Sequence, residues 1–201
     1  VNDGVMGGLS EGGPDLSKGL MRFSGNLSLE NNGGFSSIRK RVNLDLSDFT
    51  GIRLRVRGDG RTYQVRLETD ARFRNWAVSY SGNFSTRKGE WTEVKVPFTS
   101  LSQSFRGRNL TAYPFDPAKI KLVGLILADK NPGPFAIDVE WIQAYQATPS
   151  IAFPASNAKK SANGPAPGNS ELAVDETFDD RAKLGADWIV KAGKWNIVDG
   201  A

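Results

Sequence analysis

The chain has 201 residues, a hydrophobic fraction of 39% and a formal net charge of +4 at pH 7, so it is long enough to form one large globular domain or two small ones. It contains neither cysteine nor histidine. This composition excludes disulfides, Cys/His zinc sites and every catalytic scheme that uses a thiolate or an imidazole base. No apolar run approaches the roughly 20 residues of a membrane-spanning helix. We therefore expect a protein that is soluble or peripheral to a membrane.

Alternation of apolar and polar residues predicts β-strands along most of the first 146 residues. In the segment 52–57, Ile52, Leu54 and Val56 face one side and three arginines face the other. The same period occurs in 63–68, 91–96 and 135–142, whereas 121–128 is apolar on both faces, which is typical of a central strand. The turn-forming stretch 58–61 predicts a hairpin between the first two of these strands. The pattern predicts an all-β, antiparallel sandwich.

The composition changes after Tyr145. Residues 147–170 contain four prolines and few large apolar side chains, which is typical of a linker. Core-forming residues return in 171–201, where 188–190 and 194–198 are strand-like. We expect three parts: a sandwich over 1–146, a linker over 147–170, and over 171–201 either a β-hairpin that docks on the sandwich or the start of a second β-sandwich domain.

Several motifs occur together in a fixed order. They are Asn2-Asp3-Gly4-Val5-Met6-Gly7-Gly8, Asn31-Asn32-Gly33-Gly34-Phe35-Ser36-Ser37-Ile38-Arg39, Gly89-Glu90-Trp91, Phe105-Arg106-Gly107 and Gly133-Pro134-Phe135. In this combination the sequence resembles the CIA30 family, named after complex I intermediate-associated protein 30, over residues 1 to about 146. The resemblance implies a galactose-binding-like jelly-roll sandwich and a role in the assembly or upkeep of membrane electron-transport complexes. The segment 176–201 resembles the start of a concanavalin-like or laminin-G-like domain.

The Asn-Asp-Gly motif at the start has two interpretations. Asn2 and Asp3 supply amide and carboxylate oxygens, which calcium prefers, so a structural calcium site is one of them. The other is an Asx turn whose glycines adopt positive φ and which closes one end of the sandwich. We favour the turn, and we expect no other cofactor.

A set of arginines on the predicted strands is the candidate partner-binding surface. If the strands are neighbours, the side chains form one positively charged ladder, and the scarcity of acids at outward positions leaves the ladder uncompensated. Its members are Arg53, Arg55, Arg57, Arg39, Arg41 and Arg66. Arginine favours carboxylate and phosphate. We therefore expect an acidic protein partner or an anionic membrane surface, and no nucleic acid.

A second candidate site combines aromatic and basic residues. Trp76 and Tyr80 share one face of a regular strand, and Arg72 and Arg74 lie just before them. Such a set either forms a stacking platform for sugar rings or packs in the core. We expect core packing.

The sequence offers no positive sign of catalysis. The acid pairs Glu68 with Asp70 and Asp129 with Glu140 have no spacing that singles them out for glycoside hydrolysis. We expect a non-catalytic assembly factor or accessory subunit of a respiratory or photosynthetic electron-transport complex. The alternative is a carbohydrate-binding module of a secreted or periplasmic multidomain protein. We further expect an extracytoplasmic, periplasmic location, peripheral to a membrane.

Overall fold

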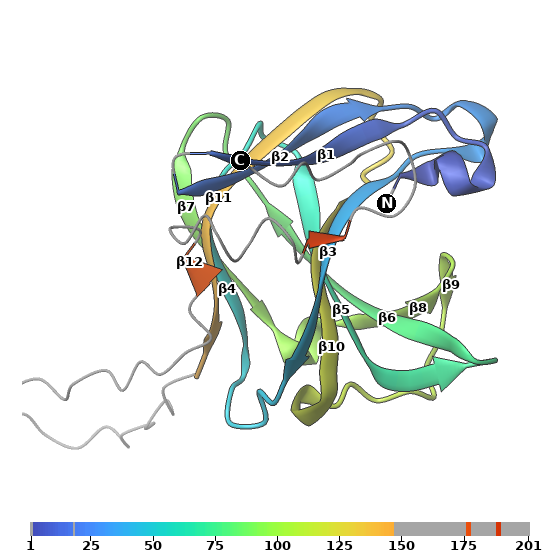
Figure 1. Cartoon of the computed structure of the whole chain (residues 1–201), viewed down its shortest axis with the longest axis vertical. Helices are drawn as coiled ribbons and strands as arrows, with labels where there is room; N and C mark the ends of the chain where they lie inside the picture. Colours follow the sequence, from blue (N-terminus) through green and yellow to red (C-terminus); the bar gives the residue numbers. More distant parts are fainter. Residues whose placement is uncertain (1, 18, 147–175, 178–187, 190–201) are drawn as a thin grey trace, which may run out of the picture.

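The computed structural model describes residues 2–17, 19–146, 176–177 and 188–189. Within these residues, strands form two antiparallel sheets that enclose a common core (Figure 1). The described residues also form four short 3₁₀ helices: η1 (Asp3–Met6) before the first strand, and η2 (Glu30–Asn32), η3 (Phe98–Ser100) and η4 (Pro117–Lys119) between strands. None of the helices in the described part of the chain is long and apolar enough to span a bilayer. The predicted antiparallel sandwich is confirmed.

Sheet I contains the first two strands and the long strand β11. Its order is β1 (Glu11–Ser17), β2 (Leu20–Leu27), β11 (Gly133–Tyr145), β4 (Gly51–Arg57) and β7 (Trp91–Pro97). Sheet II has the order β3 (Ser36–Leu44), β10 (Ile120–Leu127), β5 (Thr62–Phe73), β6 (Trp76–Ser85), β8 (Ser102–Phe105) and β9 (Arg108–Asn109). The predicted central strand 121–128 corresponds to β10, which pairs with β3 on one side and β5 on the other.

The alternation of apolar and polar residues along the strands determines which side chains form the core. Ile52, Leu54 and Val56 of β4 are buried in the same core cluster as Tyr63 and Leu67 of β5, which belongs to the opposite sheet. The three arginines of β4 consequently face outward from sheet I. The hydrophobic burial on this inner side fixes the register of the strands, because a slip by one residue would reverse the faces.

The segment 58–61 is not a hairpin, contrary to the sequence prediction. It connects β4 of sheet I to β5 of sheet II. Asp59 stabilises this crossing: its carboxylate accepts hydrogen bonds from the Tyr63 hydroxyl at 3.0 Å, from the Ala136 backbone N–H at 2.9 Å and from the Arg61 backbone N–H at 3.0 Å. The Arg61 side chain in turn forms an ion pair with Asp129 at 2.6 Å. Turn-forming residues therefore indicate a reversal here but do not say which sheet the next strand joins.

Two short pieces of the C-terminal region pair with the sandwich. Strand β12 (Glu176–Thr177) pairs with Trp141 and Ile142 of β11, beyond the end of its pairing with β2. Strand β13 (Trp188–Ile189) pairs with Arg39 and Lys40 on the edge of β3. The two strands thus extend different sheets. The predicted linker 147–170 and the second predicted strand 194–198 lie outside the described residues.

We predict that Asp59→Ala lowers the free energy of unfolding by about 2–4 kcal/mol. The substitution leaves the buried Tyr63 hydroxyl and the Ala136 N–H without their acceptor. Urea denaturation measures the loss. Asp45→Ala is the control, because Asp45 is exposed and bonds only to Ser47 among the described residues. Equal stabilities of the two variants would contradict the proposed role of Asp59.

Candidate functional site

Cations and aromatic rings alternate on the outer side of sheet I. Strand register brings them together, since β4 lies between β11 and β7. We call this surface the cation–aromatic face; it consists of Arg53, Arg55 and Arg57 of β4, Trp91 and Lys95 of β7, and Trp141 and Tyr145 of β11.

Cation–π contacts order the arginines of this face. The guanidinium carbon of Arg57 lies 5.0 Å from the centroid of the Trp91 ring, and that of Arg55 lies 5.9 Å from it. Each such contact contributes about 0.5–1 kcal/mol at an exposed site. The same arrangement recurs in two further pairs: Arg53 over Trp141 at 5.4 Å and Lys95 over Tyr145 at 5.5 Å.

Asp138 anchors one row of the cation–aromatic face. Register places it between Arg22 of β2 and Arg57 of β4. Its carboxylate accepts from Arg22 Nε at 2.8 Å and from Arg57 Nη2 at 2.9 Å. The Asp138 side chain is only 7% exposed, whereas those of both arginines are at least 39% exposed. One buried carboxylate therefore holds two guanidinium groups whose outer surfaces still reach solvent.

Two more acids neutralise part of the face. Glu140 forms an ion pair with Arg55, and Glu93 lies 3.8 Å from Arg53. The expectation that acids are too scarce at outward positions to pair with these arginines is therefore wrong. The acids come from β7 and β11, which are distant from β4 in sequence, and cations still outnumber them on this face.

The six predicted arginines do not form one ladder. Arg39 and Arg41 belong to β3 and Arg66 to β5, so all three lie in sheet II, whereas Arg53, Arg55 and Arg57 lie in sheet I. The order of strands also separates β3 from β5 by β10. The predicted single surface is thus split between the two sides of the sandwich.

Arg39 and Arg66 meet across Gly124 of β10, which pairs with both. Glu68 lies 3.9 Å from Arg39. Among the described residues, the Nε atoms of both arginines are buried without a hydrogen-bond partner. Burial, with a further contribution from the charge of Arg39, lowers the pKa of Arg66 to about 10, and Glu68 opposes the shift. Both arginines remain charged at neutral pH.

Trp76 and Tyr80 have different environments. Tyr80 is fully buried, in agreement with the expected core packing, and its ring lies edge-on to Phe115 with centroids 5.0 Å apart. Trp76 is 57% exposed, so for this residue the expectation of core packing is wrong. It begins β6 at the turn from β5, beyond the end of the core. The alternative interpretation, a sugar-stacking platform made of both rings, does not hold either, because only Trp76 reaches the surface.

The turn that carries Trp76 lies against the turn between β8 and β9. The guanidinium carbon of Arg106 lies 4.9 Å from the centroid of the Trp76 ring. Arg74 and Arg106 both have positive φ, of 47°, at the tips of these turns. We call the set Arg72, Arg74, Trp76, Arg106 and Arg108 the hairpin tip; all five residues are exposed.

The Asp3 side chain is buried, and its carboxylate accepts hydrogen bonds from three residues. Ser10 donates through its hydroxyl at 2.5 Å and its backbone N–H at 2.9 Å, and the N–H groups of Gly34 and Phe35 donate at 2.6 Å and 3.2 Å. Burial raises the pKa of Asp3, but these hydrogen bonds outweigh it and hold the pKa below the ordinary value. The carboxylate is therefore ionised at neutral pH.

Asn2 connects the same loop to the strands. Its side-chain oxygen accepts from the Ser36 hydroxyl at 2.6 Å, and its amide nitrogen donates to the Gly12 carbonyl at 3.2 Å. Because Asn2 and Asp3 are engaged by protein donors, a calcium ion would have to displace some of these bonds. The described residues include no cluster of three or more potential metal-ligating side chains of Asp or Glu. The loop geometry favours the interpretation as a closing turn.

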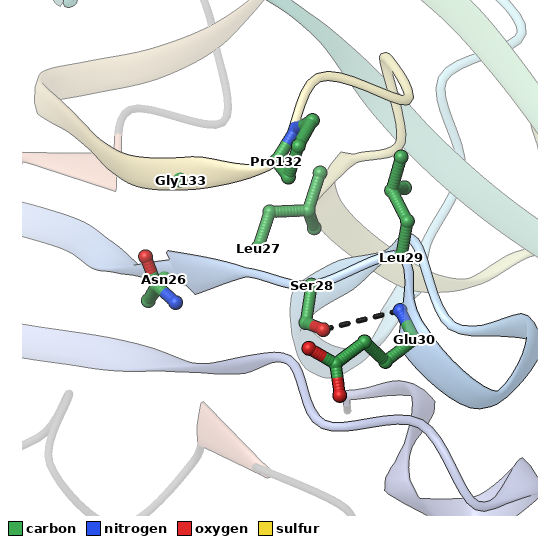
Figure 2. A pocket seen from close by; sticks show the side chains of 7 residues that line it. All are labelled: Asn26, Leu27, Ser28, Leu29, Glu30, Pro132 and Gly133. Carbon is green, nitrogen blue, oxygen red and sulfur yellow. Dashed lines mark hydrogen bonds between the residues drawn. The ribbon is translucent and has the colours of Figure 1, made fainter.

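An open hollow lies beside this loop. Figure 2 shows its lining, in which the Glu30 backbone N–H donates to the Ser28 hydroxyl at 3.2 Å. None of the predicted site residues contributes to it. The lining consists of Asn26, Leu27, Ser28, Leu29, Glu30, Pro132 and Gly133.

Sequence reasoning missed Trp91, Trp141 and Asp138 as parts of the surface. Simple alternation through 135–142 places Trp141 on the same side as the core residue Val139. A register shift between these two residues reverses the phase, so that Ile142 is buried and Trp141 faces outward. No feature of the alternation marks this bulge.

A comparison with protein-family models shows which family the chain belongs to. The model for "Complex I intermediate-associated protein 30 (CIA30)" matches residues 1–139. The chain belongs to the CIA30 family. Its relatives include mouse (Mus musculus) "Complex I intermediate-associated protein 30, mitochondrial", 35% identical over 114 residues that cover 54% of this chain and 34% of the mouse protein. A Caenorhabditis elegans protein with the corresponding name is 26% identical and covers 67% of this chain and 45% of the relative. This CIA30 chain thus spans less than half the length of these relatives.

Solved structures support the fold of this CIA30 domain. A family 11 carbohydrate-binding module of a Clostridium thermocellum cellulase has a TM-score of 0.51 and 14% identity, covering 70% of this chain and 84% of the module. At this identity the likeness concerns the fold alone. The predicted galactose-binding-like jelly-roll sandwich is confirmed.

The predicted extracytoplasmic location is wrong. The mouse, Caenorhabditis elegans and Drosophila melanogaster relatives are all named as mitochondrial proteins. The prediction relied on the lectin-like C-terminal segment and the composition of 147–170, neither of which the CIA30 match includes.

We predict that Asp3→Asn destabilises the CIA30 domain by about 3 kcal/mol at pH 7, because an amide cannot accept all the hydrogen bonds that converge on the carboxylate. Since the folded-state pKa is lowered, the ionised group stabilises the fold above the unfolded-state pKa of about 4. This contribution is lost as the pH falls through the folded-state pKa, so the difference between variant and wild type should shrink below pH 4.

Thermal denaturation between pH 2 and pH 7 measures this difference, with the exposed Asp15→Asn as the control. A difference that does not depend on pH would contradict the role of the Asp3 charge.

Calcium titration tests the other interpretation of the Asn-Asp-Gly motif, a structural calcium site. A rise in melting temperature that is lost in Asp3→Asn would show a cation site.

Proposed function

We propose that this CIA30 domain is a non-catalytic binding domain that serves as an assembly factor or accessory subunit of a membrane electron-transport complex. The family match over residues 1–139 carries the proposal, together with relatives named for their association with complex I intermediates. The mitochondrial names favour a respiratory complex over a photosynthetic one.

The state of the carboxylates supports a non-catalytic role. Asp129 is engaged by Arg61, Glu140 by Arg55, and Glu68 by Arg39. A glycoside hydrolase needs two carboxyl groups facing each other across a substrate cleft. These acids instead each face a cation, which suits a structural or surface role.

The cation–aromatic face suits a protein partner. Tryptophan and arginine are the residues enriched at the energetic centres of protein interfaces. Here cation–π contacts and carboxylates already hold the arginine side chains, so less conformational entropy is lost when a partner binds. The excess of cations selects an acidic surface. We propose that this face binds an acidic protein subunit of the complex.

We predict that Arg55→Glu with Lys95→Glu weakens binding to assembly intermediates of the respiratory complex about tenfold or more. Both side chains are exposed, and reversal of their charges opposes an acidic partner. Binding of the wild type should also weaken steeply with salt, since the Debye length is about 8 Å at 0.15 M. The purified full chain, used as bait on detergent-solubilised respiratory membranes, measures recovery of complex subunits by quantitative mass spectrometry.

Arg41→Glu with Lys121→Glu is the matched control, because it reverses two exposed cations on sheet II. The control should bind as the wild type does, and both variants should melt within a few degrees of it. Recovery of no electron-transport subunit under any salt or detergent condition would overturn the proposed function. Equal losses in both variants would overturn the assignment to sheet I.

A further inference from the structure

The hairpin tip differs from the cation–aromatic face in its charge balance. No Asp or Glu occurs between Asp70 and Glu90, or between Glu93 and Asp116. The two turns of the tip lie within these acid-free stretches. Among the described residues, no carboxylate pairs with any of its arginines; Arg72, for example, donates to the backbone carbonyls of Thr69 and Ala71 at 3.0 Å. Its positive charge is therefore uncompensated.

An aromatic base supports these cations. Phe73 and Phe105, one from each hairpin, contact each other with ring centroids 5.3 Å apart. Arg106 lies over both the Phe105 ring, at 5.4 Å, and the Trp76 ring. Trp76 is the most exposed of the large apolar side chains described. Packing between the hairpins thus presents one indole ring and four guanidinium groups on two short turns.

We propose that the hairpin tip docks this domain on the surface of an anionic lipid bilayer. Indole rings favour the interface between headgroups and acyl chains, and clustered arginines bind anionic headgroups. Two adjoining turns with a single exposed indole suit a flat, deformable surface better than a shaped protein pocket. The tip belongs to sheet II, so lipid contact there leaves the cation–aromatic face of sheet I free.

Co-flotation of the purified full chain with vesicles tests this inference. Vesicles of phosphatidylcholine with about one third phosphatidylglycerol or cardiolipin should bind the wild type, and pure phosphatidylcholine should not. Arg74→Asn with Arg106→Asn should reduce the partition coefficient about 25-fold, since each cation contributes about fivefold. Asparagine tolerates the positive φ of both positions, so the turns stay intact. Trp76→Phe should reduce quenching of tryptophan fluorescence by brominated lipid.

Arg41→Asn with Arg87→Asn removes the same charge elsewhere and should bind vesicles as the wild type does. Equal losses in both double variants, no preference for anionic lipid, or retention on an acidic polypeptide column without vesicle binding would each overturn the inference. The vesicles contain no protein. A negative result here therefore leaves the proposed function standing, and failure to recover complex subunits would leave lipid docking standing.

Discussion

Asp138 sets the geometry of the surface on which the proposed function depends. It lies on β11, which pairs with both β2 and β4, and its carboxylate is shared by Arg22 and Arg57. A carboxylate this buried would be costly without cationic partners. The same ion pairs that satisfy it hold Arg57 against Trp91, and the pattern of cation over ring continues along β4. Burial of one acid thus orders a set of outward-facing cations.

Two basic regions result, with different physical characters. On the cation–aromatic face, acids from β7 and β11 fix the arginines and leave a modest excess of positive charge. At the hairpin tip, aromatic packing places arginines where no described acid approaches them. The first arrangement favours specific contacts with a shaped partner, and the second favours long-range attraction to a charged surface. Together they would orient the domain between a membrane and a protein complex.

Much of the fold could be predicted from the sequence. The alternation of apolar and basic residues from Ile52 to Arg57, for example, indicates which side of the strand is buried. Alternation does not say which sheet a strand joins. Arg53 and Arg66 consequently lie on different sides of the sandwich although their strands follow each other in the chain. Ion-pair partners such as Asp138 depend on register between distant strands, and the bulge before Trp141 reverses the phase of the pattern. Trp76 is exposed because the turn between β5 and β6, where it lies, extends beyond the core.

The affinity of Asp138→Asn for the assembly intermediate tests the account most directly. The substitution adds one unit of net positive charge and removes the carboxylate that holds Arg22 and Arg57. If ordered arginines make the interface, as we conclude, the variant binds more weakly than the wild type, although it is more basic and remains folded by circular dichroism. If binding stays equal or becomes tighter, charge alone drives association, and the ordered cation–aromatic face is not the partner site.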